Sequence, residues 1–478
     1  MATSSSKKTS VSSSSLLWLV AVGFFMETLD STIVNTALPS MAKSLGESPL
    51  SMHSVIIAYS LTLAVLIPAS GWVADRFGIR KAFFAAILIF STGSVLCALS
   101  QTLSQIVASR ILQGVGGCML MPIGRLAVLR AFPGAGFLPA ISFVTIPGLV
   151  GPLIGPTLGG WLVEVASWHW IFLINIPIGI VGLIATHYVM RGFPAEHPKE
   201  KFDFAGFLRL SFFMVAISLA LDGSTELHFA NGTILVLIVF GLASLISYVF
   251  HAYRNKDAIF SLELFNVRTY SIGLAGNFFA RLGSSGMPFL IPLLLQINLE
   301  YSPFQAGLMM IPIAASGIFA KRFATYWITL WGYRRFLIGN TIAVGIMIAS
   351  FFWIRDDQNF WGRLIQLSVF GFVNSLQFTA MNTVTLKDIE KGRTASGNSL
   401  FSMVQMLAMS FAVAFAGLLL NSFLQYYGGA QAEGASLKAF HATFVCMGLF
   451  TCSSAWIFWQ LAPDLNATPK EPRSLEVV

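Results

Sequence analysis

The sequence predicts an all-α polytopic membrane protein with fourteen transmembrane helices, arranged as two six-helix bundles with two extra central helices. Of its 478 residues, 55% are hydrophobic and only 10% are charged, whereas soluble domains carry about a quarter charged residues. The hydrophobic residues also lie in long runs of about 20 residues, the length at which a helix crosses the hydrocarbon core of a bilayer. A soluble fold of this size has no means of burying so much apolar surface.

The first apolar run, residues 16–38, follows a Ser-rich tail that carries Lys7 and Lys8. This arrangement resembles a secretory signal peptide. However, the run is too long for one, contains Glu27 and Asp30, and lacks a clear A-x-A cleavage site. We therefore expect it to remain in the protein as the first membrane span.

The other runs divide the chain into five segments. We expect an N-terminal tail at 1–15, a six-helix bundle at 16–190, a two-helix insert with cytoplasmic linkers at 191–269, a second six-helix bundle at 270–462 and a tail at 463–478. The expected spans lie at about 16–38, 52–74, 82–100, 104–128, 138–165, 168–190, 204–222, 232–253, 270–297, 303–328, 334–355, 360–384, 395–424 and 438–462. Spans longer than 20 residues can tilt within the bilayer.

Basic residues decide the expected orientation. With a cytoplasmic N-terminus, 21 of the 29 Lys and Arg residues lie on the inner side and four on the outer side, so both termini are expected to be cytoplasmic. Lys321 and Arg322 are counted here within a cytoplasmic loop, and Arg125 and Arg209 are expected to snorkel from cytoplasmic helix ends. Because the basic residues lie in short loops, the net charge of +8 does not indicate nucleic-acid binding.

Enzymatic and metal chemistry find no support in the sequence. Its four cysteines, Cys97, Cys118, Cys446 and Cys452, all fall in apolar runs, so buried free thiols are expected, with no disulfides and no metal site. The sequence contains no HExxH, GxSxG or phosphate-binding glycine loop, so we expect no enzyme. It also contains no nucleotide-binding domain, so ATP hydrolysis is not expected, and any transport by this protein would use an ion gradient as its energy source.

Four motifs follow one another on the first five expected spans. They are LDSTIVNTALP (29–39), GWVADRFGIRK (71–81), RILQGVGG (110–117) and GLVGPLIGPTLGG (148–160). Together they resemble the signatures of the fourteen-span drug:proton antiporter family of the major facilitator superfamily, and within it the MdtD-type branch. The resemblance implies a major facilitator fold and a place in the bacterial inner membrane. It also implies a proton gradient as energy source, no cofactor, and a monomer whose partners are protons, a small-molecule substrate and the lipid bilayer.

The second motif is expected to form a conformational gate, with Gly71, Asp75, Arg76, Gly78, Arg80 and Lys81 as its residues. Gly78 permits a tight turn that a β-carbon would strain. We expect Asp75 to pair with Arg76, Arg80 or a neighbouring helix, although the ordinary excess of basic residues in cytoplasmic loops explains Arg80 and Lys81 equally well. A degenerate copy of this turn contains Gly332 and indicates two repeats related by an axis along the membrane normal.

The antiporter motif of the fifth span comprises Gly148, Gly151, Pro152, Gly155, Pro156, Gly159 and Gly160. Gly151, Gly155 and Gly159 recur every four residues, so they share a helix face that lets another helix approach closely. The two prolines are expected to bend the helix. The resemblance favours a role in the conformational change, with ordinary helix packing as the alternative.

Ionisable residues within spans indicate the transport chemistry, because each costs about 2.5–3.5 kcal/mol or more at the bilayer centre unless it is paired or wet. Glu27 and Asp30 are three residues apart, so they share a helix face, and two close carboxylates favour protonation of one of them. Arg110 is the expected counter-charge. The resemblance assigns Asp30 and Arg110 to proton coupling, and Glu27 joins them as the second acid on the same helix face, with a static ion pair as the alternative. Asp30→Asn is expected to abolish coupled export while leaving folding intact.

Substrate binding is assigned to Arg281, with Asn35, Asn277, Asn374 and Gln377 as further candidates. A fixed guanidinium suits a carboxylate, although Arg281 could instead pair with a first-span acid. Two acids balance two arginines within the spans, which favours anionic or zwitterionic cargo. We therefore expect a proton-coupled exporter of a small organic solute, either an amphiphilic drug or an organic anion such as citrate or a metal-chelating carboxylate. An uptake symporter for an organic anion is the alternative.

Overall fold

The structure is a computed structural model that describes residues 13–47, 52–190, 201–225, 229–255, 257–301, 303–355, 358–428 and 434–462. Every regular element in these residues is a helix, so the predicted all-α class is confirmed. The four cysteines are free, as expected, but only Cys97 and Cys118 are buried, while Cys446 and Cys452 are half-buried.

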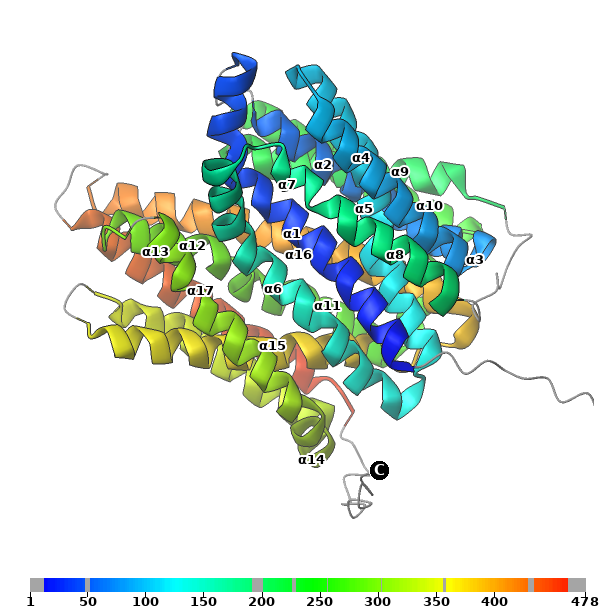
Figure 1. Ribbon diagram of the computed structural model, residues 1–478. Helices are drawn as coiled ribbons and strands as arrows, with labels where there is room; N and C mark the ends of the chain where they lie inside the picture. The colour runs from blue at the N-terminus through cyan, green and yellow to red at the C-terminus, as the bar shows by residue number, and fades with distance from the viewer. Residues whose placement is uncertain are drawn as a thin grey trace, which may run out of the picture.

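The first half of the chain forms one helical bundle (Figure 1). A 3-10 turn, Ile67–Ala69, joins α2 to α3, and α7 leads directly into α8, so each of these pairs makes one span. The helices are α1 (Ser13–Leu45), α2 (His53–Leu66), α3 (Ser70–Phe77), α4 (Ile79–Leu99), α5 (Leu103–Ala131), α6 (Phe137–Val165), α7 (Trp170–Leu173) and α8 (Asn175–Val189).

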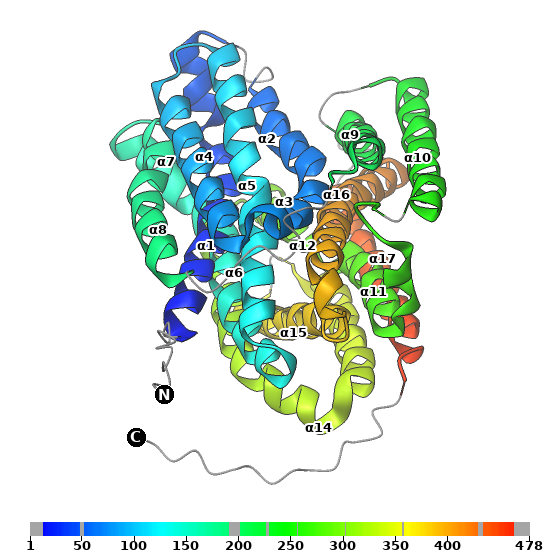
Figure 2. The same ribbon diagram turned by 90° about the vertical axis from the view of Figure 1, so that its right-hand side faces the viewer.

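Two peripheral helices and a second bundle complete the fold. The peripheral pair is α9 (Phe204–Thr225) and α10 (Asn231–Arg254), which pack against each other, with α9 also contacting α2 and α16. Figure 2 shows the pair at the flank of the molecule. The second bundle consists of α11 (Arg268–Ser284), α12 (Met287–Ile297), α13 (Pro303–Leu308), α14 (Ile311–Ser350), α15 (Phe360–Leu386), α16 (Thr394–Tyr426) and α17 (Ala435–Trp459).

The described helices account for the fourteen expected spans. Twelve are long and apolar enough to cross a membrane, and a thirteenth consists of Phe137–Pro152 and Thr157–Val165, which meet at a bend of 49° within α6. One of the twelve, Gln305–Trp353, is 49 residues long and contains a non-helical residue, Gly332. Figure 2 shows the U-shaped course of α14, so this helix crosses twice and raises the number to fourteen.

The turn at Gly332 has the same backbone conformation as the turn at Gly78. Their φ and ψ angles are 72° and 160° at Gly332, and 83° and 146° at Gly78. An L-residue with a side chain rarely adopts a positive φ of this kind, so glycine is needed at both turns. Each turn joins the second and third spans of its bundle, which agrees with the internal repeat predicted from the sequence.

Two basic residues lie elsewhere than expected. Lys321 and Arg322 were predicted in a cytoplasmic loop, but both are helical residues of α14, eleven and ten positions before Gly332. At a rise of about 1.5 Å per residue, they lie roughly 15 Å above the turn. Lys321 is buried and Arg322 is exposed. The expected loop position was therefore wrong, because the tenth span continues to the glycine turn.

The two bundles are joined at one end and separate at the other. We call the face on which α1 begins and α17 ends the terminal side, and the other face the opposite side. At the terminal side one hydrophobic core runs from Val20 in the first bundle to Phe401 in the second. At the opposite side each bundle has its own core, around Ile33 in the first and Phe444 in the second, and Figure 1 shows the bundles diverging there. The molecule is therefore closed at the terminal side.

Candidate functional site

Asp30 and Arg110 form a fully enclosed ion pair between α1 and α5. The side chains are 0% and 1% exposed, and Arg110 Nη1 donates to Asp30 Oδ2 at 2.6 Å. The other carboxylate oxygen, Oδ1, accepts hydrogen bonds from Gln113 Nε2 at 2.8 Å and from Asn175 Nδ2 at 2.9 Å. All four residues belong to the first bundle, and each is nearly inaccessible. The structure thus brings together the predicted pair and adds two amides that sequence analysis had not identified.

The guanidinium of Arg110 is also held from its other faces. Its carbon Cζ lies 4.1 Å from the ring centroid of Tyr59 and 5.8 Å from that of Phe172. Arg110 Nη1 also donates to Gln113 Oε1 at 2.7 Å. These contacts hold the guanidinium in place, although the Tyr59 hydroxyl and Asn175 Oδ1 have no hydrogen-bond partner among the described residues. In this conformation the geometry is that of the static ion pair considered as an alternative.

Glu27 lies one helical turn from Asp30 but has a different environment. Its side chain is half-buried, and its enclosed oxygen Oε2 has no hydrogen-bond partner. Arg125 of α5 attracts it electrostatically, but no ion pair between the two is recorded among the described residues. The two acids that the sequence placed on one helix face therefore differ, since Asp30 is saturated with donors while Glu27 retains a free oxygen.

Arg125 does not snorkel to a helix end as expected. It is 3% exposed and crosses between the bundles, where Nη1 donates to Ser402 Oγ at 3.2 Å and Nη2 to Gln405 Oε1 at 2.7 Å, both on α16. Its carbon Cζ lies 4.8 Å from the ring centroid of Phe401, and its Nε has no partner. The expectation was wrong because α5 continues to Ala131, which leaves Arg125 about one and a half turns inside the helix.

Arg281 lies in α11 with 4% of its surface exposed. Its Nε donates to Asn277 Oδ1 at 3.2 Å, its Cζ lies 4.3 Å from the ring centroid of Phe378, and its Nη2 is enclosed without a partner. No carboxylate, and so no acid of α1, is among these contacts of the described residues, which removes support for the alternative pairing with a first-span acid. Asn277 holds the guanidinium from one side and leaves the other available.

Lys321 is a functional candidate that sequence analysis missed. The side chain is 6% exposed, and Nζ donates to Thr145 Oγ1 on α6 and, at 3.2 Å, to Thr379 Oγ1 on α15. The ring of Phe378 lies 5.7 Å from Nζ, so Lys321 and Arg281 share this ring. Thr145 belongs to the first bundle, so Lys321, like Arg125, joins the two bundles.

Arg125, Arg281 and Lys321 form what we call the central cations, at the junction of the two bundles. They come from three helices, α5, α11 and α14, and none of the hydrogen bonds recorded for them in the described part of the chain involves a carboxylate. Arg125 and Arg281 are close enough to repel each other. Glu27 is the acid that acts on this group, so the site carries an excess of positive charge whether or not Glu27 is ionised. Buried unpaired cations at mid-membrane are expensive and therefore indicate a function.

The other predicted binding residues fall into two groups. Gln377 is 1% exposed and bonds to Asn340 and Thr341 of α14, so it joins helices within the second bundle and is not a cavity residue. Asn277 positions Arg281. Asn35 is exposed and Asn374 is half-buried, and their role in binding stays a prediction.

The predicted gate lies at the terminal side. Asp75 pairs with Arg130 of the neighbouring α5, with 2.6 Å between Oδ1 and Nη2, while Arg80 bonds to His187 and Lys81 is exposed. Gly71 packs directly on α16, since a β-carbon there would lie 2.8 Å from the carbonyl oxygen of Ala395. Two more contacts cross between the bundles here: the hydroxyls of Ser70 and Ser399 lie 2.9 Å apart, and Asn398 Nδ2 donates to the Pro122 carbonyl at 2.7 Å. Arg76 is half-buried, and the positive φ of Gly78 makes the turn.

The glycine stripe of α6 faces α1 and not the second bundle. Gly151, Gly155 and Gly159 meet a matching stripe of Thr28, Thr32 and Thr36, and each threonine hydroxyl donates to a backbone carbonyl of α1. Gly148 is loosely packed, and a β-carbon at Gly160 would meet no other atom within 4 Å. The bend of α6 falls between Pro152 and Thr157, in the segment that holds both prolines. The stripe therefore fixes α1, which carries Glu27 and Asp30.

We expect Gly151→Ala to destabilise the protein and Gly160→Ala to leave it unchanged or slightly more stable. A β-carbon at Gly151 would lie 2.8 Å from the backbone nitrogen of Leu29, where nothing can move aside, and such overpacking costs about 1–3 kcal/mol. At Gly160 the same methyl group meets open space, and alanine is the better helix former. Thermal unfolding of the two purified variants measures the difference. Equal melting temperatures would contradict close α1–α6 packing.

The chain is similar to known transporters over most of its length. A model of the Major Facilitator Superfamily matches residues 20–413. A protein of Pectobacterium atrosepticum named "Putative multidrug resistance protein MdtD" is 48% identical over 448 residues, which cover 94% of this chain and 96% of that protein. Its namesake from Salmonella typhimurium is 49% identical over 450 residues, covering 94% and 95%.

Two solved structures have the same architecture. The human organic anion transporter MFSD10 (TETRAN) superposes with a TM-score of 0.67 at 13% identity, covering 94% of this chain and 99% of that one. The proton:xylose symporter XylE superposes with a TM-score of 0.64 at 16% identity, covering 94% and 96%. At such identities the likeness concerns the fold alone.

Proposed function

We propose, from the premise that this chain belongs to the major facilitator superfamily, that it is a proton-coupled exporter of small organic anions working by alternating access. The superfamily and the MdtD-type relatives expected from the four motifs are confirmed. The chain is a multi-pass membrane transporter and not an enzyme. The relatives' name supports efflux, while the coupling ion and the charge of the substrate are our proposal.

The observation that supports an anionic substrate most directly is the group of central cations. Arg125, Arg281 and Lys321 present donors to one junction, with enclosed donors still free on Arg125 and Arg281. Arginine forks match carboxylates, and a buried charge is stabilised when its counter-charge arrives. A solute with two or three carboxylates, such as citrate or a chelate of a metal by such a carboxylate, would neutralise the excess charge. A cationic drug would add to it.

Proton coupling is assigned to Glu27, with the Asp30–Arg110 pair as its fixed neighbour. An ionised Glu27 attracts Arg125, and protonation removes this attraction, so it changes the charge balance at the junction of the two bundles. For export, the proton must favour the return of the emptied carrier toward the cytoplasm, while the anion is carried in the opposite half of the cycle. The saturated contacts of Asp30 make it the less accessible of the two acids.

The closed terminal side fits one state of a transport cycle. We infer from the distribution of basic residues that this side is cytoplasmic, so the conformation faces outward. Arg125 and Lys321 hold the two bundles together through neutral partners, namely Ser402, Gln405 and Thr145. Once an exported anion has left, these two cations return to their neutral partners, so both bridges hold the emptied carrier closed to the cytoplasm until the coupled proton binds. We further propose a monomer in the bacterial inner membrane, with no cofactor and no nucleic-acid partner.

Energised inside-out vesicles test the proposed function. Collapse of the pH gradient is recorded as citrate, ferric citrate or a lipophilic cationic dye is added, with vesicles lacking the protein as the control. Proton release with a carboxylate and not with the dye is the expected result. Proton release with the dye alone would instead indicate that the protein exports amphiphilic cations. Uptake of the carboxylate together with protons, in the opposite direction, would instead identify a symporter.

We expect Glu27→Gln to lower proton-driven export to the level of vesicles without the protein, while downhill exchange of labelled citrate continues. The substitution removes the titrating group and leaves the central cations in place. Glu164→Gln is the matched control, because Glu164 is an exposed acid at the far end of α6. If Glu27→Gln exported citrate against its gradient at the normal rate, Glu27 would not carry the coupled proton.

A further inference from the structure

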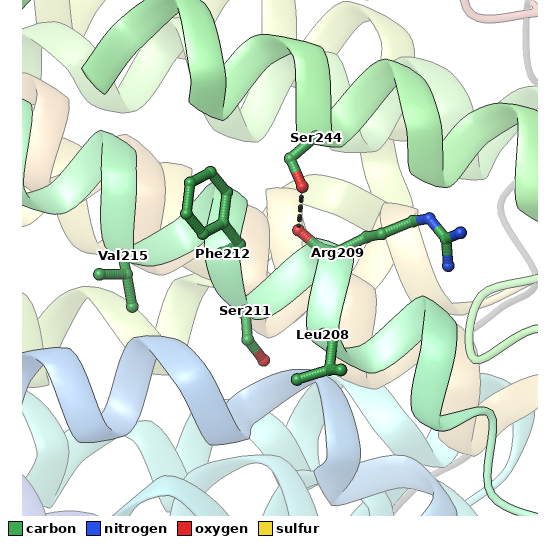
Figure 3. Close-up of a pocket in the computed structure, with 6 residues that line it drawn as sticks. All are labelled: Leu208, Arg209, Ser211, Phe212, Val215 and Ser244. Carbon is green, nitrogen blue, oxygen red and sulfur yellow. Dashed lines mark hydrogen bonds between the residues drawn. The ribbon is translucent and has the colours of Figure 1, made fainter. Parts of the chain in front are cut away.

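A groove lies along the outer surface of the peripheral pair, where α9 and α10 pack against each other. Its volume is about 480 Å³, and its lining residues are Leu208, Arg209, Ser211, Phe212, Val215 and Ser244. Figure 3 shows these side chains, with Phe212 and Val215 along α9 and Ser244 facing them from α10. The residues on α9 follow the 3- and 4-residue spacing of one helix face, so the groove runs along the helix from Arg209 toward the bilayer centre.

The walls of the groove offer an apolar surface to its occupant. The two serine hydroxyls are already used, since Ser211 donates to the Val65 carbonyl at 3.0 Å and Ser244 to the Arg209 carbonyl at 2.9 Å. Phe212 is exposed on α9, and α10 is largely exposed along its length. In a membrane, this side of the molecule faces lipid, so the groove is in contact with hydrocarbon chains and not with water.

One end of the groove carries a guanidinium. Arg209 turns toward the terminal side, where Nη1 donates to the Ala205 carbonyl at 2.7 Å and Nε to Ser247 Oγ at 3.0 Å. In Figure 3 it points away from Phe212 and Val215. The side chain is partly solvent-accessible, and its Nη2 atom takes part in neither of these two hydrogen bonds. A long basic side chain commonly extends in this way from within a span to the headgroup layer.

The charge around this end is complementary to an anion. Lys201 and Arg254 are exposed at the same ends of the two helices. Of the acids at this end, Asp203 is occupied by His251, with 2.8 Å between Oδ1 and Nε2, and Asp257 is exposed beyond Arg254. Basic clusters at the cytoplasmic membrane surface attract anionic headgroups. An apolar groove that ends at a guanidinium is complementary to a phospholipid, because the groove can hold an acyl chain and the guanidinium can bind the phosphate.

We propose that the α9–α10 groove binds an anionic phospholipid of the leaflet at the terminal side, with one acyl chain along the groove and its phosphate on Arg209. The bound lipid covers the apolar groove of the peripheral pair, which attaches to the rest of the molecule mainly through α9, with Tyr248 of α10 bonded to the Phe260 carbonyl. This gives the two extra helices of the fourteen-span fold a role, and it does not depend on the substrate or the direction of transport.

Lipid titration of the purified full-length protein in detergent tests the proposal. Dioleoyl phosphatidylglycerol and dioleoyl phosphatidylcholine share their chains and differ in headgroup charge, and binding of each is followed by native mass spectrometry. We expect the wild-type protein to bind phosphatidylglycerol about fivefold or more tightly than phosphatidylcholine. This is the size of the attraction between one basic side chain and an anionic lipid headgroup. Arg209→Gln is expected to lose this preference. Val215→Trp, which fills the groove, is expected to weaken binding of both lipids.

The matched control is Arg322→Gln, since Arg322 is another exposed arginine within a span, on α14. It is expected to keep the wild-type preference. A full preference in Arg209→Gln would remove the headgroup site, and an equal loss in Arg322→Gln would show attraction without a specific site. Unchanged binding in Val215→Trp would place the chain elsewhere. A dimer that dissociates in Val215→Trp would identify a second copy as the occupant and overturn the proposal.

Discussion

Arg281→Gln and Lys321→Gln are each expected to weaken citrate binding by about 10- to 100-fold, and the double variant is expected to abolish measurable binding. A hydrogen bond to a charged partner contributes about 1.5–3 kcal/mol, and each 1.4 kcal/mol is a factor of ten in the dissociation constant. The two side chains flank one ring, that of Phe378, so a single carboxylate-rich solute can reach both. Titration calorimetry on the purified protein measures the effect.

The melting temperature of these variants is a second measurement, and it distinguishes a binding role of the two cations from a structural one. Neither cation contacts a carboxylate within the described residues, and an unpaired charge at mid-membrane costs about 2.5–3.5 kcal/mol or more. Neutral variants are therefore expected to unfold at the same temperature as wild type or higher, although they no longer bind citrate. If they lost stability and kept their affinity for citrate, both residues would be structural, and the anion site would be wrong.

Arg322→Gln is the control for position and charge in this experiment. Arg322 follows Lys321 directly but is exposed on the other face of α14. Its removal is expected to leave citrate affinity unchanged. The pair thus separates a local effect at the junction of the bundles from a general effect of positive charge on an anion.

The sequence predicted the fold and the ion pair well because their signals are local. Hydropathy runs indicated the spans, and Asp30 and Arg110 stand out as charges inside them. Gly78 and Gly332 were recognisable as turn residues, and both have the positive φ that only glycine adopts readily. These features follow from composition along one helix or one turn.

The site between the bundles could not be predicted in the same way. Lys321 and Arg125 lie near charged or basic stretches that resemble the end of a span, and a hydropathy window treats a charge as a boundary. Their burial depends on how far α14 and α5 continue, and on the threonine, serine and glutamine that face them from the other bundle. Partners so distant in sequence leave no pattern in a single chain.

The same limit applies to Glu27 and Asp30. Their spacing indicated two carboxylates on one helix face, but it did not show that Asn175 and Gln113 would saturate one of them. Nor did it show that Asp75 would pair with Arg130 of the neighbouring helix α5. Pairing between helices is decided by packing, which the spacing within one helix does not contain.

Asp30→Asn is expected to destabilise the protein by about 3–5 kcal/mol, which replaces the sequence-based expectation that folding would stay intact. Removing one partner of a buried ion pair leaves the other charge uncompensated, and Arg110 is 1% exposed. The amide of asparagine would also direct donors at Gln113 and Asn175, which already donate to this position. Unfolding of the purified variant in denaturing detergent measures the loss.

The double variant Asp30→Asn/Arg110→Gln decides between a structural pair and a pair that works only in transport. Removing both charges removes the uncompensated one, so most of the lost stability is expected to return, and the two single effects should be far from additive. Coupled citrate export in the double variant then reports on function without the confounding unfolding. Normal export would show that the pair has a structural role, in which it holds α1 in position for Glu27. Loss of export in a stable protein would show that Asp30 takes part in proton coupling. Additive losses of stability would show that the two charges do not depend on each other, against the 2.6 Å contact between them.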